Sequence, residues 1–190
     1  MTEALDLLRS AGAASPGNLD APTPCSQWTV LQVLQHAAGD QLAWAAALGT
    51  GSGPDQNPFE PSGKFDGTTE DLLTPALATA RQAWATVAAD AGPVPTPLPQ
   101  GALPPATAAA ACALDAAVHA WDVTAALGQP SALTPELARE LLPAARAIVE
   151  PLRAYGAYAP ALIPQPGDDA AAELLRYLGR DPGWSADQAV

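Results

Sequence analysis

The chain contains two histidines, and aspartates accompany each of them at helical spacing. Asp115 precedes His119 by four residues, and Asp122 follows it by three. Asp40 likewise follows His36 by four residues. Residues three or four apart lie on one face of a helix, so each imidazole is predicted to have carboxylates beside it. Clusters of imidazole and carboxylate groups bind divalent metal ions or transfer protons.

A metal site needs N and O donors that converge from different segments, and a helical bundle supplies them from facing helices. Asp115 and His119 can reach one ion from a single helix face, and His36 can complete the set from a second helix. Two histidines and one carboxylate leave coordination positions open for water or substrate, as in catalytic sites. The spacing thus predicts a metal site, with Asp40 as a candidate general base or, alternatively, a surface acid.

Two simpler interpretations fit the same residues. The stripe with Asp115, His119 and Asp122 is a solvent face, and His36 is a packed core histidine. A solvent face usually carries long charged side chains, yet residues 105–127 contain no lysine or glutamate. Two aspartates on one face also repel each other unless a cation or a buried partner offsets them. The stripe therefore favours a site, while periodicity leaves the environment of His36 open because its helix is apolar almost all round.

The elements that must position these groups are predicted to be helices. Alanine, the best helix former, supplies much of the 48% hydrophobic content, and no alternating strand pattern of useful length is present. Segments rich in proline and glycine separate helices expected over residues 2–13, 29–48, 68–92, 105–127, 133–156 and 168–179. Pro75 allows an alternative start of the third helix at Thr74, and Pro143 and Pro151 are expected to kink or divide the fifth. The predicted fold is an all-α helical bundle.

Length and charge restrict the function further. At 190 residues, the chain is predicted to form a single domain, with a core over about 2–130 and a C-terminal helical extension over about 133–184. The net charge is −12 and the eight basic residues are scattered, which argues against nucleic-acid or anionic-membrane partners. The sequence contains no disulfide framework, secretion signal or membrane-spanning stretch, so a cytoplasmic location is expected. A monomer and a homodimer are both compatible with the sequence.

Neither of the two cysteines is expected to be reactive. Cys25 lies in the loop before the second predicted helix and is expected to pack in that turn, since nothing cationic nearby would lower the pKa of its thiol. Cys112 lies on the polar stripe of the fourth helix and is expected to pack as a small hydrophobic residue.

Two strings resemble the DinB-like superfamily and, within it, the branch of mycothiol-dependent maleylpyruvate isomerase. They are PTPCSQWTVLQVLQHAAGD at residues 22–40 and AAVHAWDVTAALGQP at residues 116–130. This family typically shows Pro-Thr-Pro-Cys, Gly-Trp-Thr and a helical histidine, and later an acid, His-x-Trp-Asp and a Gly-Gln pair. The closing LLRYLGRDPGW is also similar to the end of this branch, so the resemblance covers most of residues 2–184. The chain departs from the pattern at Gln27, where glycine is usual.

The resemblance implies a four-helix bundle with one divalent metal ion, often zinc, held by His36, Asp115 and His119. Nickel and manganese are alternative metals. The isomerase has glutamate where this chain has Asp115, so Asp115 is expected to bind the ion either directly or through a water molecule. Asp122 is expected either to orient His119 or a metal-bound water, or to form a salt bridge with an arginine. No thiol-binding residues are assigned.

The function implied by the resemblance is a metal-dependent enzyme that activates a low-molecular-weight thiol such as mycothiol. The thiol would serve S-transfer to, or isomerisation of, a small electrophilic metabolite. A metal ion with open positions lowers the pKa of a bound thiol and so delivers a thiolate near neutral pH. Two alternatives remain. One is a thiol-independent metalloenzyme or small-molecule-binding protein of a specialised biosynthetic pathway, and the other is a fold relic without metal that acts as a binding module.

Overall fold

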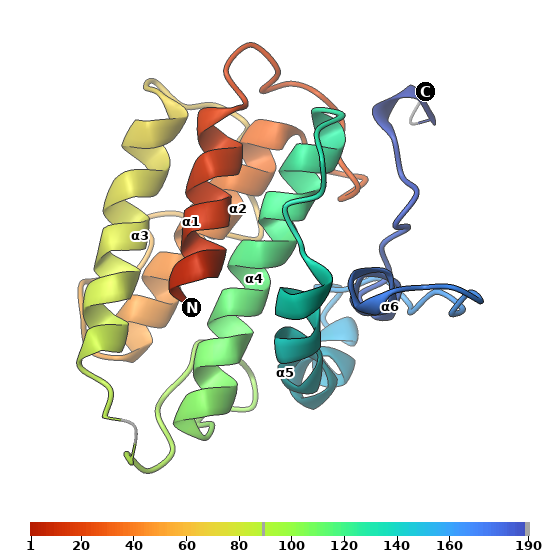
Figure 1. Cartoon of the computed structure of the whole chain (residues 1–190). Helices are drawn as coiled ribbons and strands as arrows, with labels where there is room; N and C mark the ends of the chain where they lie inside the picture. Colours follow the sequence, from red (N-terminus) through yellow and green to blue (C-terminus); the bar gives the residue numbers. More distant parts are fainter. Residues whose placement is uncertain (89, 189–190) are drawn as a thin grey trace.

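The computed structural model describes residues 1–88 and 90–188, whose regular elements are helices (Figure 1). Their bounds are α1 Thr2–Ala13, α2 Val30–Ala47, α3 Thr69–Ala85, α4 Pro105–Ala126, α5 Pro135–Arg153, α6 Ala170–Tyr177 and the short 3-10 helix η1 Ala186–Gln188. Over these described residues, bridge pairing is limited to two isolated bridges, and no strand forms. The predicted all-α class is therefore confirmed. Residue 89, inside the helix predicted over 68–92, lies outside the described residues.

Helix α4 lies at the centre of the molecule. It packs against α1 and α2, which in turn pack against α3, and it also packs against α5, which carries α6 (Figure 1). With neighbours on several sides, α4 has every residue from 111 to 124 buried. The solvent-face interpretation of the stripe with Asp115, His119 and Asp122 is therefore wrong.

Helix α3 starts at the first predicted position and ends earlier than predicted. The Thr68 hydroxyl accepts from the N–H of Asp71, and the Asp71 carboxylate accepts from the N–H of Thr68. This capping box sets the start of the helix, so the alternative start at Thr74 is wrong. The helix ends at Ala85 because the hydroxyl and the N–H of Thr86 both donate to the carbonyl three residues earlier, which closes the last turn.

Helix α5 continues through its internal prolines. Pro143 and Pro151 lie inside one unbroken helix, so the predicted division of this segment does not occur. Pro143 is on the exposed face, where water can reach the carbonyl of Arg139 that a proline leaves without a donor.

One hydrophobic core joins the four-helix bundle to the C-terminal helices. Leu34 of α2 and Leu114 of α4 belong to the same buried cluster as Ile148 of α5 and Leu174 of α6. Helix α5 packs on α4, and α6 packs on α5. No helix in the described part of the chain is both long and apolar enough to cross a membrane.

Candidate metal centre

The three predicted metal ligands come together between α2 and α4. His36 faces α4 from α2, and its Nε2 atom lies 3.6 Å from Oδ1 of Asp115. The same oxygen lies 3.3 Å from Nε2 of His119, one helical turn further along α4. One ligand atom from each residue lies within 4.8 Å of the other two, and all three side chains are buried. Two imidazole nitrogens and one carboxylate oxygen thus converge on a single point.

Both imidazole rings are held by their other nitrogen. Nδ1 of His36 lies 3.0 Å from the carbonyl oxygen of Pro58, and Nδ1 of His119 lies 2.9 Å from Oδ2 of Asp122. A carbonyl or an ionised carboxylate only accepts hydrogen bonds, so each Nδ1 must donate. In a neutral ring the lone pair then sits on Nε2, which points at Asp115. Metal-binding histidines have such a partner on the second nitrogen, so the donor set fits a divalent transition metal.

Asp115 has a partner for each of its oxygens. While Oδ1 faces the two histidines, Oδ2 accepts from Nε2 of Gln41 at 3.4 Å. Gln41 is fully buried, and its Oε1 accepts from the Cys112 thiol at 3.1 Å. Burial raises the pKa of Cys112, which therefore packs as an un-ionised residue. Sequence reasoning missed Gln41, which lies one residue after Asp40 in α2.

The histidines and the carboxylates of the centre shift each other's pKa. Burial favours a neutral Asp115, but the charge and hydrogen bonds of His119 and His36 outweigh it and lower the pKa of Asp115. Burial also disfavours a charged His119, yet Asp115 and Asp122 raise its pKa well above 6.5. The centre thus attracts positive charge, which a proton or a metal ion can supply.

Asp40 lies beside the three ligands on α2. Its Oδ2 atom is 4.0 Å from Nε2 of His36, and its side chain is only 20% exposed. Burial and then the negative charge of Asp115 raise the pKa of Asp40 to about 7. The surface-acid interpretation of Asp40 is therefore wrong, because the carboxyl faces the centre. Its role as a general base stays a prediction.

Asp122 makes both of the contacts that the sequence left as alternatives. It accepts from His119, as described, and it forms an ion pair with Arg180 in which Nε and Nη2 each lie 2.8 Å from a carboxylate oxygen. The Cys25 thiol also donates to Oδ2 of Asp122 at 3.2 Å, and Nη2 of Arg180 lies 3.4 Å from its sulfur. The expectation that no cation lies near Cys25 is wrong, because Arg180 is distant in sequence and adjacent in the fold.

Aromatic side chains surround the centre. Trp28 packs on the His36 ring with the centroids 4.7 Å apart, and Phe59 meets the same ring edge-on at 5.3 Å. Phe59 is 55% exposed, so it lies between the centre and solvent. From the C-terminal extension, Tyr158 comes close enough for burial and the charge of Asp115 to raise its pKa to about 12. Sequence reasoning assigned no site role to these three residues, because no spacing rule links their segments to the histidines.

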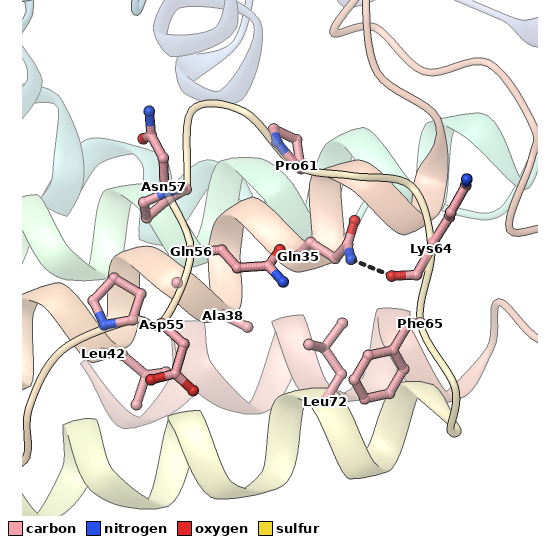
Figure 2. Close-up of a pocket in the computed structure, with 13 residues that line it drawn as sticks. Gln35, Ala38, Leu42, Asp55, Gln56, Asn57, Pro61, Lys64, Phe65 and Leu72 are labelled. Atoms are coloured by element: carbon pink, nitrogen blue, oxygen red, sulfur yellow. Dashed lines mark hydrogen bonds between the residues drawn. The ribbon is translucent and has the colours of Figure 1, made fainter.

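A separate cavity of about 180 Å³ lies between α2, α3 and the loop that joins them (Figure 2). Gln35 crosses it, donating from Nε2 to the carbonyl oxygen of Lys64 at 2.9 Å. Pro58 lines this cavity, and its carbonyl oxygen also accepts the hydrogen bond from Nδ1 of His36. The three predicted metal ligands do not line this cavity, so it is distinct from the metal centre.

Comparison with known proteins gives a family and two relatives. The profile of the mycothiol maleylpyruvate isomerase N-terminal domain matches residues 1–124. Two similar relatives are the uncharacterized proteins Rv0738 and MT0763 of Mycobacterium tuberculosis, from strains H37Rv and CDC 1551 respectively. Each is 39% identical over 137 residues, which cover 70% of this chain and 68% of the relative. No solved structure matches the chain.

Proposed function

The chain belongs to the mycothiol maleylpyruvate isomerase N-terminal domain family, and from that premise we propose that it is a metal-dependent enzyme that activates a low-molecular-weight thiol. Mycothiol is the proposed thiol, and the reaction is S-transfer to, or isomerisation of, a small electrophilic metabolite. One observation carries the proposal. His36, His119 and Asp115 aim three donor atoms at one point, while both Nδ1 atoms are held by acceptors.

His36, His119 and Asp115 are the residues that would hold the metal, and zinc suits this donor set. Two atoms that each lie about 2.1 Å from a tetrahedral ion are about 3.4 Å apart. The distances of 3.3 and 3.6 Å from Oδ1 of Asp115 to the two Nε2 atoms agree with this value, which favours direct binding by Asp115. When bound, the ion would supply Lewis acidity and lower the pKa of a thiol.

The chain's own groups have separate roles in the proposed reaction. Asp40 faces the centre, so its carboxylate is placed to take the proton that the thiol gives up. The thiolate sulfur would then form a bond to the electrophilic carbon of an activated double bond, whose π electrons move onto the conjugated carbonyl oxygen. For S-transfer, the proton on Asp40 returns to the adduct, and for isomerisation, the C–S bond breaks again after rotation and releases the thiolate. Trp28 and Phe59 shield the His36 side of the centre from water, which strengthens the electrostatic interactions inside.

The proposed setting is the cytoplasm, as a monomer or homodimer with small-molecule ligands and without nucleic-acid or membrane partners. The net charge of −12 supports the absence of polyanionic partners. Cys25 and Cys112 are both free thiols, which agrees with a reducing compartment.

Metal analysis of the purified protein is the first test. About one divalent ion per chain is expected, with loss of the ion in His36→Ala and in His119→Ala. Gln129→Ala, at an exposed position without a side-chain hydrogen bond to the described residues, is the matched control and should keep the ion. Absence of the ion after dialysis against zinc, nickel and manganese would contradict the metal-dependent function.

Turnover assays then separate the thiol-dependent enzyme from its alternative. The metal-loaded protein is supplied with a small electrophile such as maleylpyruvate, with and without mycothiol. The proposal predicts consumption of the electrophile only when the thiol is present. Turnover at the same rate without any thiol would instead favour a thiol-independent metalloenzyme.

A further inference from the structure

The segment that follows α6 brings an arginine to the metal centre. We infer that Arg180 is a positioning residue of this centre, because its guanidinium holds the Asp122 carboxylate that orients the His119 ring. The inference rests on the proposed function, in which His119 binds the metal. Arg180 lies outside residues 1–124, the part of the chain that the family profile matches, so the C-terminal extension completes the centre.

The backbone at the end of α6 directs Arg180 toward the bundle. The N–H of Arg180 donates to the carbonyl of Leu175 at 2.8 Å, and Gly179 has a φ of 82°, in the left-handed region. A Cβ at Gly179 would lie 2.7 Å from the carbonyl oxygen of Ala159, so the preceding loop packs directly on the glycine. The position therefore requires glycine, and the chain leaves α6 along a defined path.

The ion pair with Asp122 is buried and two-pronged. Nε of Arg180 lies 2.8 Å from Oδ1, and Nη2 lies 2.8 Å from Oδ2. The Asp122 side chain is fully buried, and that of Arg180 is only 11% exposed. Because the guanidinium is planar, two parallel hydrogen bonds fix the plane of the carboxylate as well as its distance. A lysine would supply the charge without fixing that plane.

The orientation of Asp122 reaches the metal ligand through one hydrogen bond. Its Oδ2 atom accepts from Nδ1 of His119 at 2.9 Å, and this contact turns Nε2 of the same ring toward Asp115. Without Arg180, Asp122 would be a fully buried carboxylate that has lost its counter-charge. Without the two parallel hydrogen bonds that fix its plane, the carboxylate can rotate away from His119, and the ring then loses the acceptor that holds it.

Arg180→Met tests the inference, with Arg180→Lys beside it. Arg176 provides the matched control, because it lies on α6 and pairs with Asp168 through one contact at 2.9 Å, away from the centre. Zn²⁺ affinity is measured by competition with a chromophoric chelator, and the ¹⁵N shifts of the His119 ring are measured in the metal-free proteins. Arg180→Met should weaken Zn²⁺ binding about 10- to 100-fold and shift the Nδ1 resonance of the His119 ring, because the hydrogen bond to Asp122 is lost. Arg180→Lys should have a Zn²⁺ affinity between those of Arg180→Met and the wild type. Arg176→Met should match the wild type in both Zn²⁺ affinity and ring shifts.

If Arg180→Met binds Zn²⁺ as tightly as the wild type and has the same His119 ring shifts, the inference is overturned. An equal loss in Arg176→Met would also overturn it, because docking of α6 would then explain both effects. If Arg180→Met does not fold, Arg180→Gln, which keeps N–H donors, is judged by the same two measurements. If the wild type itself binds no Zn²⁺, the proposed function fails, while the ring shifts of the metal-free variants still decide the role of Arg180.

Discussion

The carbonyl oxygen of Pro58 lies 3.0 Å from Nδ1 of His36, so a loop orients the first of the two histidines. The loop can approach α2 this closely because residue 39 is glycine. A Cβ at Gly39 would lie 2.9 Å from Cγ of Pro58 and 3.0 Å from its Cβ. Two residues of α2 therefore place the loop: Gly39 leaves room for Pro58, and His36 forms a hydrogen bond to the Pro58 carbonyl oxygen.

Gly39→Ala is expected to weaken Zn²⁺ binding by about tenfold, the lower range for loss of a partner that orients a metal-binding histidine. The rigid Pro58 ring must move away, and its carbonyl leaves His36. Alanine also favours the helix by about 1 kcal/mol over glycine, which offsets the strain, so the unfolding free energy should change little. Chelator competition and urea unfolding measure the two effects. Gly92→Ala, whose Cβ would meet no atom within 4 Å, is the control; unchanged affinity in Gly39→Ala would refute the prediction.

Metal binding is expected to strengthen as pH rises from 6 to 8. Burial lowers the pKa of His119, but Asp115 and Asp122 outweigh it and raise the pKa well above 6.5, so the ion must displace a proton. In the metal-free protein, the stabilisation by charged His119 is fully present below pH 6.5 and is lost as pH rises through the raised pKa. Calorimetric titration with Zn²⁺ in buffers of different ionisation enthalpy counts the protons released. At least one proton should be released per Zn²⁺ bound at pH 7. If no proton is released, His119 is not charged in the metal-free protein at this pH.

Composition and local pattern were sufficient to predict the fold class, and local spacing was sufficient to place two of the ligand candidates on one face. Asp115 and His119 share a helix face because they are four residues apart, and this relationship needs no tertiary information. The resemblance carried by the strings around His36 and His119 led to the family that the profile match now shows. Sequence alone did not reveal that α4 is buried along the length of its polar stripe, since an alanine-rich helix is compatible with several packing partners.

Long-range contacts account for what the sequence did not predict. Arg180 is 58 positions from Asp122 and 155 from Cys25, and no spacing rule relates positions so far apart. One signal did exist, because Arg180 belongs to the closing string LLRYLGRDPGW that took part in the family resemblance. The early end of α3 depends on hydrogen bonds of Thr86, a local effect that the hydrophobic pattern does not record.

Gln41→Leu is expected to lower the unfolding free energy by about 1–3 kcal/mol, the range for buried polar groups left without a partner. The change removes the amide that donates to Asp115 and accepts from the Cys112 thiol. Urea unfolding of the metal-free protein measures the effect. The same substitution at exposed Gln129 should change the unfolding free energy by no more than about 0.5 kcal/mol. If both variants unfold alike, the buried amide does not stabilise the centre.

Replacement of Asp115 tests whether it binds the metal directly. Oδ1 of Asp115 is the atom that both Nε2 atoms face, so Asp115→Ala should lose the ion while His36 and His119 remain. Asp115→Glu keeps a carboxylate, and the family isomerase has glutamate at the corresponding position, so this variant should retain about one Zn²⁺ per chain. Its longer side chain displaces the Gln41 contact, and we expect an affinity within about tenfold of the wild type. Elemental analysis gives the stoichiometry, and chelator competition gives the affinity. Full occupancy in Asp115→Ala would show that Asp115 is not a direct ligand, and its carboxylate would then act on the ion only through water.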